Sequence, residues 1–462
     1  MIKSKLVSLF SGLLLVAACT NDEVLDGVNI EIPDESTVSS KIRTYDEALQ
    51  IAKDASAMLE DDGVKTKSAN VKRMLDMSEG VKAVVFPRTK GATGAYDSDT
   101  LMYVFNYEDN QGYVIVSANP ATEGLIAVTE SGHYDPAEDI ENPGFKLYME
   151  LAKQRIMLIK HPPLDSTKLN DSLLIDETDT TSGGGYTPNP QFDQTKRVSE
   201  KVVTSRVYPV ITKRWGQRNP EGWSCPNKIS GCMNTAAFII MSYFSYPSTL
   251  HLTYLEDAPT ITIDWGRIHD HVKSGDTCNI QTHNQISYIC REIGYRSNSN
   301  YYNTDPKSTG TTSVNIKNAL TGLGYNVSSS KTYSAGCLAN PLEEGWKALM
   351  FAKIKDKASS SDDEGDGHGW VVDGVYNYYI YTREYLMAGG TSTWVLQSES
   401  TTYYKYNHVN WGWNGLDNGY YSANTFDTYY ISIRDYDNDY IIDYCPIEDV
   451  QYFLVKRINW YE

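Results

Sequence analysis

The chain contains the stretch Ser230-Gly231-Cys232-Met233-Asn234-Thr235-Ala236-Ala237-Phe238-Ile239-Ile240-Met241-Ser242-Tyr243-Phe244, in which a cysteine follows a glycine and begins an apolar run that ends near Pro247. The run predicts a buried helix with Cys232 in its first turn. The positive end of a helix dipole favours a thiolate, and the free backbone N–H groups there can bind an oxyanion. Cys232 is therefore a candidate nucleophile. The alternative is a small buried apolar side chain.

Composition limits the classes of function. The chain has 462 residues, a formal net charge of −18 at pH 7, 35 Tyr, 9 Trp and 33 Gly. This length predicts about two or three domains, and the aromatic, turn-rich composition predicts a β-rich globular protein. The acidic balance argues against nucleic acid and against anionic membrane surfaces as partners.

Residues 1–18 predict an export signal. Two lysines precede an apolar run over 6–18 that is too short to span a membrane. The run ends in Val16-Ala17-Ala18-Cys19, which resembles a bacterial lipoprotein box. We therefore expect Cys19 to be lipidated and to anchor an exported protein at the outer membrane, the cell surface or the periplasmic face. The alternative is an ordinary secretory signal that contains a cysteine.

Composition divides the rest of the chain into four segments. They are a polar tether over 19–43, a first domain over 44–161, a linker over 162–200 rich in Pro, Gly and acidic residues, and a second domain over 201–462. The composition of the linker is typical of a solvated segment that proteases cut readily.

The two domains have different patterns. In the first, a capping box over 44–47 begins a helix, strands over 101–107 and 113–117 form a hairpin, a third strand covers 125–128, and a helix covers 145–160. These elements predict a small α+β domain, in which no catalytic constellation is visible. The second domain begins helix-rich and becomes strand-rich after Trp370.

The second domain offers a residue for each role that a thiolate nucleophile requires. His368 is flanked by glycines and enters an apolar strand 136 residues after Cys232, which makes it the candidate base; His408 is the other histidine in such a context. Beyond it, Asn410 can orient the imidazole and Trp411 can shield that hydrogen bond, although a β-turn with packing tryptophans is the alternative. Gln217 offers a neutral amide donor for an oxyanion.

Four ordered motifs resemble the streptopain family of secreted papain-like cysteine peptidases over most of the chain. They are W-x-Q at 215–217, G-C-x-x-T-A at 231–236 followed by Tyr246-Pro247, H-x-x-V-x-D-G at 368–374 and H-V-N-W-G-W-x-G at 408–415. The first domain resembles that family's inhibitory propeptide through 103–105 and 112–117. Departures at 233–234, at 238–239 and in the acidic insert 362–364 bear on substrate preference more than on chemistry.

The resemblance implies an α+β fold, with a papain-like catalytic domain of one helical and one antiparallel β lobe behind an α+β propeptide. It also implies a role for each candidate residue. These are Cys232 as nucleophile, His368 as base and acid, Gln217 with the Cys232 N–H as the oxyanion hole, and Asn410 with Trp411 beside the histidine.

We therefore expect a secreted, lipid-anchored cysteine endopeptidase made as a zymogen, with protein or peptide substrates and its own propeptide as inhibitor. No cofactor, metal or nucleic acid is expected, since the calcium-like run 435–439 lacks the required Gly and Glu. Two alternatives remain open for the whole chain: a binding lipoprotein without turnover, and a Cys–His amidase or acyltransferase. For the first domain alone, the alternative is an adhesion or spacer domain.

Overall fold

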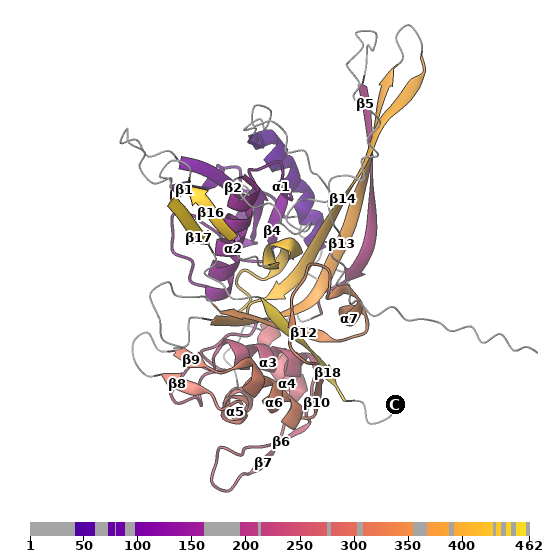
Figure 1. The fold of residues 1–462 in the computed structure, drawn as a ribbon. Coiled ribbons are helices and arrows are strands. Elements are labelled where there is room, and N and C mark those ends of the chain that lie inside the picture. The colour runs from indigo at the N-terminus through magenta and orange to yellow at the C-terminus, as the bar shows by residue number, and fades with distance from the viewer. Residues whose placement is uncertain are drawn as a thin grey trace, which may run out of the picture. The chain divides into compact units, whose positions relative to one another are not determined.

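Figure 1 shows the computed structural model of the chain. It describes residues 42–60, 73–78, 80–87, 98–160, 195–210, 214–274, 279–302, 308–353, 367–387, 392–427, 431–435, 440–444 and 450–458. The expected signal, Cys19, nearly all of the tether, and linker residues 162–194 lie outside these ranges. All described residues fall within one compact unit, Ile42–Glu462.

The amino-terminal part of this unit is an α+β domain, as the sequence predicts. Its elements are α1 (Tyr45–Glu60), β1 (Lys82–Pro87), β2 (Ser98–Asn106), η1 (Glu108–Asn110), β3 (Tyr113–Ser117), β4 (Leu125–Thr129) and α2 (Pro143–Lys160). The predicted capping box is present, because the Glu47 N–H donates to Thr44 Oγ1 at 3.3 Å and the Thr44 N–H donates to Glu47 Oε2 at 2.8 Å. The predicted hairpin is present as the antiparallel pair β2–β3.

The two helices of this domain cover opposite faces of its sheet. Successive side chains of a strand point to opposite faces. In β3, Tyr113 and Ile115 pack in the cluster that contains α2 residues, whereas Val114 and Val116 pack in the cluster that contains α1 residues. The strands of this domain are therefore buried on both sides.

The second part of the chain begins with helices and ends with long strands. Its helices are α3 (Cys232–Phe244), α4 (Trp265–Ser274), α5 (Ile280–Arg296), α6 (Ser313–Gly322), α7 (Ala339–Glu343) and the 3₁₀ helix η3 (Ala423–Phe426). The predicted helix at Cys232 is thus confirmed. Every residue of α3 from Met233 to Ser242 is buried, because this helix is apolar on all sides and forms the centre of the helical region.

The strands of the second part form one large sheet and three small hairpins (Figure 1). The strands of the large sheet are β5 (Thr195–Val207), β10 (Tyr325–Val327), β11 (Lys331–Thr332), β12 (Lys347–Lys353), β13 (Gly367–Met387), β14 (Trp394–Asn410), β15 (Gly419–Ser422) and β18 (Gln451–Arg457). The hairpins pair β6 (Thr249–His251) with β7 (Thr260–Thr262), β8 (Asn300–Tyr302) with β9 (Ser308–Gly310), and β16 (Ile431–Asp435) with β17 (Tyr440–Tyr444).

One sheet runs through both parts of the chain. Its order is β1-β2-β3-β4-β15-β14-β13-β12-β18-β10, with β5 paired to β13 and β11 to β18. The junction is the antiparallel pair β4–β15, in which Ala127, Val128 and Thr129 face Tyr421, Tyr420 and Gly419. The sequence did not predict this junction. The expected α+β class, with a helical region and an antiparallel sheet, is confirmed.

The segment after the expected linker is also part of the sheet. Residues 195–200, which the sequence assigned to the linker, belong to β5 and pair with the outer half of β13, from Leu386↔Thr195 to Tyr381↔Glu200. None of the helices in the described part of the chain is long and apolar enough to cross a membrane.

Candidate active site

Cys232 is the first residue of α3 and follows a glycine that the local geometry requires. Gly231 has φ 91°, and a Cβ atom there would lie 2.7 Å from the carbonyl oxygen of Thr309. This left-handed conformation and the close approach both favour glycine. The turn places Cys232, which is half-buried, at the free N-terminal end of the helix.

The Cys232 thiol is not activated in this form of the protein. Burial raises its pKa, and the backbone N–H groups of Gly369, Met233 and Cys232 itself lower the pKa by less. The helix end therefore acts in the direction that the sequence predicts. The expected net preference for thiolate is wrong here, because removal of water from the sulfur outweighs the effect of the helix end.

A second glycine brings the candidate base close to the nucleophile. A Cβ atom on Gly369 would lie 2.2 Å from Met233 Sδ, so β13 packs directly on the first turn of α3. The Gly369 N–H points at the Cys232 sulfur, and His368 is the preceding residue of the same strand. The structure thus brings together the two residues that the sequence paired.

His368 is buried, neutral and held by a backbone carbonyl. Its side chain is 4% exposed and lies 6.4 Å from both the Trp370 and Trp411 rings, measured between ring centroids. Burial lowers the pKa of His368 to about 4, although the hydrogen bond to the Trp411 carbonyl raises the pKa by a smaller amount. His368 Nε2 lies 3.2 Å from the Trp411 oxygen. Because a carbonyl only accepts, the single proton of the neutral ring is on Nε2, and Nδ1 is the basic atom.

No hydrogen bond joins Cys232 to His368, although the structure describes both residues. The sulfur faces backbone amides and the imidazole faces a carbonyl. A thiol with a raised pKa beside an imidazole with a lowered pKa favours the neutral pair over the thiolate–imidazolium pair.

Trp411 lies beside His368, as the sequence predicts, and Asn410 precedes it. The atom that holds the imidazole is the backbone carbonyl oxygen of Trp411, whereas the sequence predicted the side-chain oxygen of Asn410. Asn410 Oδ1 accepts from the Gly412 N–H at 3.1 Å, while the Trp411 carbonyl holds His368. The Trp411 indole is fully buried and donates to the Asp417 carbonyl at 3.1 Å. Trp411 therefore both covers and orients the histidine, and the catalytic roles of the two residues stay predictions.

Gln217 lies beside the turn that leads to Cys232. Its carbonyl accepts from the Ser230 N–H at 2.8 Å and from Ser230 Oγ at 3.1 Å. Its side chain is partly exposed. The third expected member of the site is therefore next to the nucleophile, and its role as oxyanion donor stays a prediction.

The first turn of α2, from the amino-terminal domain, covers this site. A Cβ atom on Gly144 would lie 2.4 Å from Trp411 Cε3 and 2.5 Å from His368 Cδ2. Further along the helix, the Tyr148 ring centroid lies 4.7 Å from that of Tyr421 and 5.0 Å from that of Phe426. The contact of Gly144 with the imidazole adds to the burial of His368 by the Trp370 and Trp411 rings.

The start of α2 is fixed on the second part of the chain by Asn142. Its Oδ1 caps the helix by accepting from the N–H groups of Gly144 and Phe145, at 3.1 and 3.3 Å, and its Nδ2 donates to Asp417 Oδ2 at 3.1 Å. Tyr113 of β3 donates to the other oxygen of Asp417 at 2.7 Å. Asp417 thus joins the amino-terminal domain to the turn that follows Trp411.

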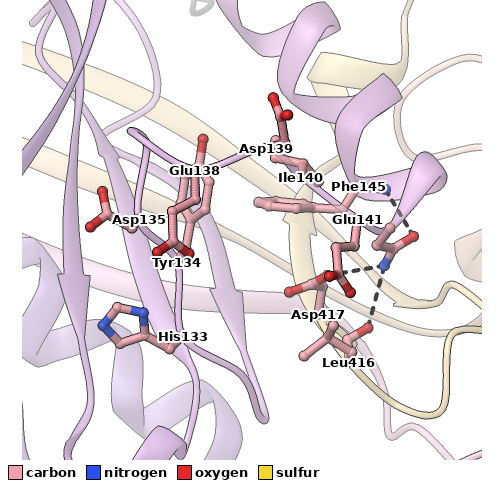
Figure 2. A pocket seen from close by; sticks show the side chains of 11 residues that line it. His133, Tyr134, Asp135, Glu138, Asp139, Ile140, Glu141, Phe145, Leu416 and Asp417 are labelled. Carbon is pink, nitrogen blue, oxygen red and sulfur yellow. Dashed lines mark hydrogen bonds between the residues drawn. The ribbon is translucent and has the colours of Figure 1, made fainter.

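A carboxylate-lined pocket of about 190 Å³ lies at this junction (Figure 2). It is lined by His133, Tyr134, Asp135, Glu138, Asp139, Ile140, Glu141, Asn142, Phe145, Leu416 and Asp417. Within the part of the chain that the structure describes, no group of three or more His, Cys, Asp or Glu side chains is placed to hold a metal ion.

A buried ionic group that the sequence analysis missed joins the two parts near the site. His408 is 2% exposed, and its Nδ1 and Nε2 donate to Asp373 at 2.7 Å and Glu130 at 3.0 Å. Burial alone would lower the pKa of His408, but the two carboxylates raise it to about 10. A charged ring with both nitrogens engaged cannot act as a base, which leaves His368. His408 and Asp373 stood in the quoted motifs, whereas nothing near Glu130 in sequence indicated a partner.

Of the other cysteines, Cys225 and Cys290 are buried, Cys337 is half-buried, and all three are free thiols. Cys278, Cys445, Cys19 and the acidic insert 362–364 lie outside the described residues.

Comparison with known proteins identifies both parts of the chain. Residues 213–421 match the model of the Peptidase C10 family, and residues 39–156 match the model of the Spi protease inhibitor. The thiol protease/hemagglutinin PrtT of Porphyromonas gingivalis is 20% identical over 342 residues, which is 71% of this chain and 34% of that protein. This chain therefore spans about a third of the length of that relative.

Two solved structures from Prevotella intermedia are similar to the chain. Prointerpain A is 17% identical, with a TM-score of 0.45, over 83% of this chain and 98% of that one. Active interpain A is 18% identical, with a TM-score of 0.34, over 59% of this chain and 98% of that one. The two family matches confirm the resemblance that the motifs indicated: the chain carries a Peptidase C10 domain, of the streptopain family, behind a Spi-type inhibitor domain.

Proposed function

We propose that the chain is the zymogen of an exported cysteine endopeptidase that hydrolyses proteins or peptides through a thioester on Cys232. The observation that carries this proposal is the contact between the first turn of α3 and the start of β13. It places the Cys232 sulfur against the Gly369 amide, one residue from His368. The Peptidase C10 match supports the same reaction class.

In the proposed reaction, His368 Nδ1 takes the proton of the Cys232 thiol, and the thiolate adds to the scissile carbonyl carbon. The oxyanion accepts hydrogen bonds from the Cys232 backbone N–H and the side-chain amide of Gln217. His368 then gives its proton to the leaving amine, the C–N bond breaks, and a thioester remains. Water adds to the thioester as His368 removes its proton, and collapse releases the acid and the thiol.

The amino-terminal domain keeps this reaction from starting, in our proposal, by covering His368 with the first turn of α2. The contacts of Gly144 exclude water from the imidazole and hold it on the Trp411 carbonyl. Cleavage in the expected linker and departure of the domain would return both Cys232 and His368 to solvent. Their pKa values would then move toward each other and permit proton transfer.

Replacement of Gly144 by valine tests the cover. The added atoms have no room between His368 and Trp411, so the helix start must shift. Overpacking of this kind costs about 1–3 kcal/mol, which corresponds to a rise of roughly 5- to 150-fold in the population of the opened chain. We expect Gly144→Val to accelerate the alkylation of Cys232 by iodoacetamide in the uncut chain by about tenfold, as read by mass spectrometry of the labelled peptide.

Lys146→Val provides the matched control, because Lys146 is exposed in the same turn of α2 and receives the same β-branched residue. Its labelling rate should stay within about twofold of the wild-type rate. Equal rates for Gly144→Val and Lys146→Val would show that α2 does not limit access to Cys232.

Replacement of Cys232 by serine tests the nucleophile. Serine is similar in size to cysteine, but its hydroxyl is a far weaker acid than the thiol. After limited proteolysis of the chain, the rate of hydrolysis of a fluorogenic peptide should therefore fall at least about 10³-fold, with little change in the unfolding temperature. Cys337→Ser, at a half-buried free thiol, should retain activity. Hydrolysis by Cys232→Ser would point to another nucleophile. If the wild-type chain hydrolyses nothing, the alternative of a binding lipoprotein is favoured. If it prefers small amides, the alternative of an amidase is favoured.

We also propose that Cys19 carries a lipid that anchors the exported protein. The support is the lipoprotein box at 16–19. Cys19→Ala should move the protein from the membrane fraction to the soluble fraction of the producing cells. Its continued presence with membranes after a high-salt wash would contradict the lipid anchor.

A further inference from the structure

The segment Trp215–Gln217, which carries the proposed oxyanion donor, is held through its own backbone. Its three carbonyl oxygens each accept a hydrogen bond from a different part of the catalytic domain. The bonds are Asn414 N to Trp215 O (2.9 Å), Thr235 Oγ1 to Gly216 O (3.2 Å) and Ser230 N to Gln217 O (2.8 Å). Two of these three anchors, Ser230 and Thr235, flank Cys232 itself. The segment is thus built against the nucleophile turn.

A fourth anchor of the segment is a buried carboxyl group. The Gly216 N–H donates to Glu221 Oε1 at 2.8 Å, and Glu221 is 1% exposed. Space around Gly216 is small, since a Cβ atom there would lie 2.2 Å from Asn414 Oδ1. Gly216, the residue before Gln217, is therefore held at its N–H by Glu221 and at its carbonyl oxygen by Thr235.

Glu221 occupies this place at a cost in stability. Its Oε2 is buried without a hydrogen-bond partner among the residues that the structure describes. Burial raises the pKa of this carboxyl group, and the backbone amides that face it lower the pKa by less, so that the pKa is about 7. A carboxyl group with one unpaired buried oxygen is less favourable than an apolar side chain of the same size. Such an exception to the usual burial rules is typical of a residue with a functional task.

We propose that Glu221 is a positioning residue for the oxyanion hole: by accepting the Gly216 N–H, it fixes the direction from which the Gln217 amide meets the substrate oxyanion. This inference rests on the proposed peptidase function. It concerns the hydrogen-bond donor alone, because the Cys232 sulfur faces the amides of Gly369, Met233 and Cys232 and not Glu221. Displacement of a preorganised donor by about 1 Å lowers the rate by up to ~10²-fold without weakening the binding of substrate to the same extent.

Two variants separate the hydrogen bond from the packing. Glu221→Gln keeps an acceptor oxygen for the Gly216 N–H. The glutamine is uncharged, which matches the protonated form that the buried carboxyl partly adopts near neutral pH. Glu221→Met fills the same space without an acceptor. The chain is activated by limited proteolysis, kcat and KM are measured with a fluorogenic peptide, and the rate of Cys232 alkylation by iodoacetamide is measured in parallel. Alkylation is a displacement at carbon that forms no oxyanion, so it reports on the thiol alone.

We expect Glu221→Met to lower kcat by about 10- to 100-fold, with KM within about threefold and the alkylation rate within about twofold of the wild-type values. Glu221→Gln should keep kcat within about threefold. If Glu221→Met does not fold, as judged by its unfolding temperature, Glu221→Asp takes its place. The shorter side chain withdraws the acceptor, and the same loss of kcat is expected.

Other outcomes overturn the assignment. A folded Glu221→Met variant with wild-type kcat would show that the hydrogen bond to Gly216 has no part in catalysis. A parallel fall in kcat and in the alkylation rate would show that Glu221 only supports the fold around Cys232. A wild-type chain that is alkylated at Cys232 but hydrolyses no peptide would instead contradict the proposed function, and the assignment of Glu221 with it.

Discussion

The pairing of β4 with β15 is the constraint on which the cover over the candidate active site depends. Its register sets Ala127 to Thr129 against Gly419 to Tyr421 and so fixes the amino-terminal domain on the catalytic sheet. The same domain carries α2, whose first turn then lies on the rings of His368 and Trp411. A displacement of two residues in the register would move this helix by about 7 Å and uncover the site.

Burial shifts the pKa values of the two candidate catalytic residues in this form of the protein. Removal of water raises the pKa of the Cys232 thiol and lowers the pKa of His368 to about 4. The two shifts have opposite signs, and both oppose proton transfer from sulfur to nitrogen. The cover acts on the chemistry of the residues without requiring that either be removed from the site. The interface itself combines aromatic packing around Tyr148 with the ionic contact between the buried His408 and the half-buried Glu130.

The sequence predicted the elements whose causes are local and missed those whose causes are distant. The capping box at Thr44, the β2–β3 hairpin and the apolar helix at Cys232 each follow from a short pattern, and all three are present. The junction β4–β15 joins segments about 290 residues apart, which leaves no local pattern. Its one indication in the sequence is the continuous apolar run Leu-Ile-Ala-Val of β4, a strand in which every residue is buried. Likewise, Glu221 lies in a polar stretch that resembles surface, and its burial depends on the fold around it.

In the uncut chain, the cover over the site holds His368 as a neutral ring with its proton on Nε2. The direct test is ¹⁵N NMR of the uncut protein labelled in histidine, with the His368 signals assigned from a His368→Gln sample. Because the pKa of His368 is lowered to about 4, we expect one protonated nitrogen, Nε2, and one unprotonated nitrogen, Nδ1, at every pH from 5 to 8. An imidazolium with both nitrogens protonated at pH 7 in the uncut chain would contradict it.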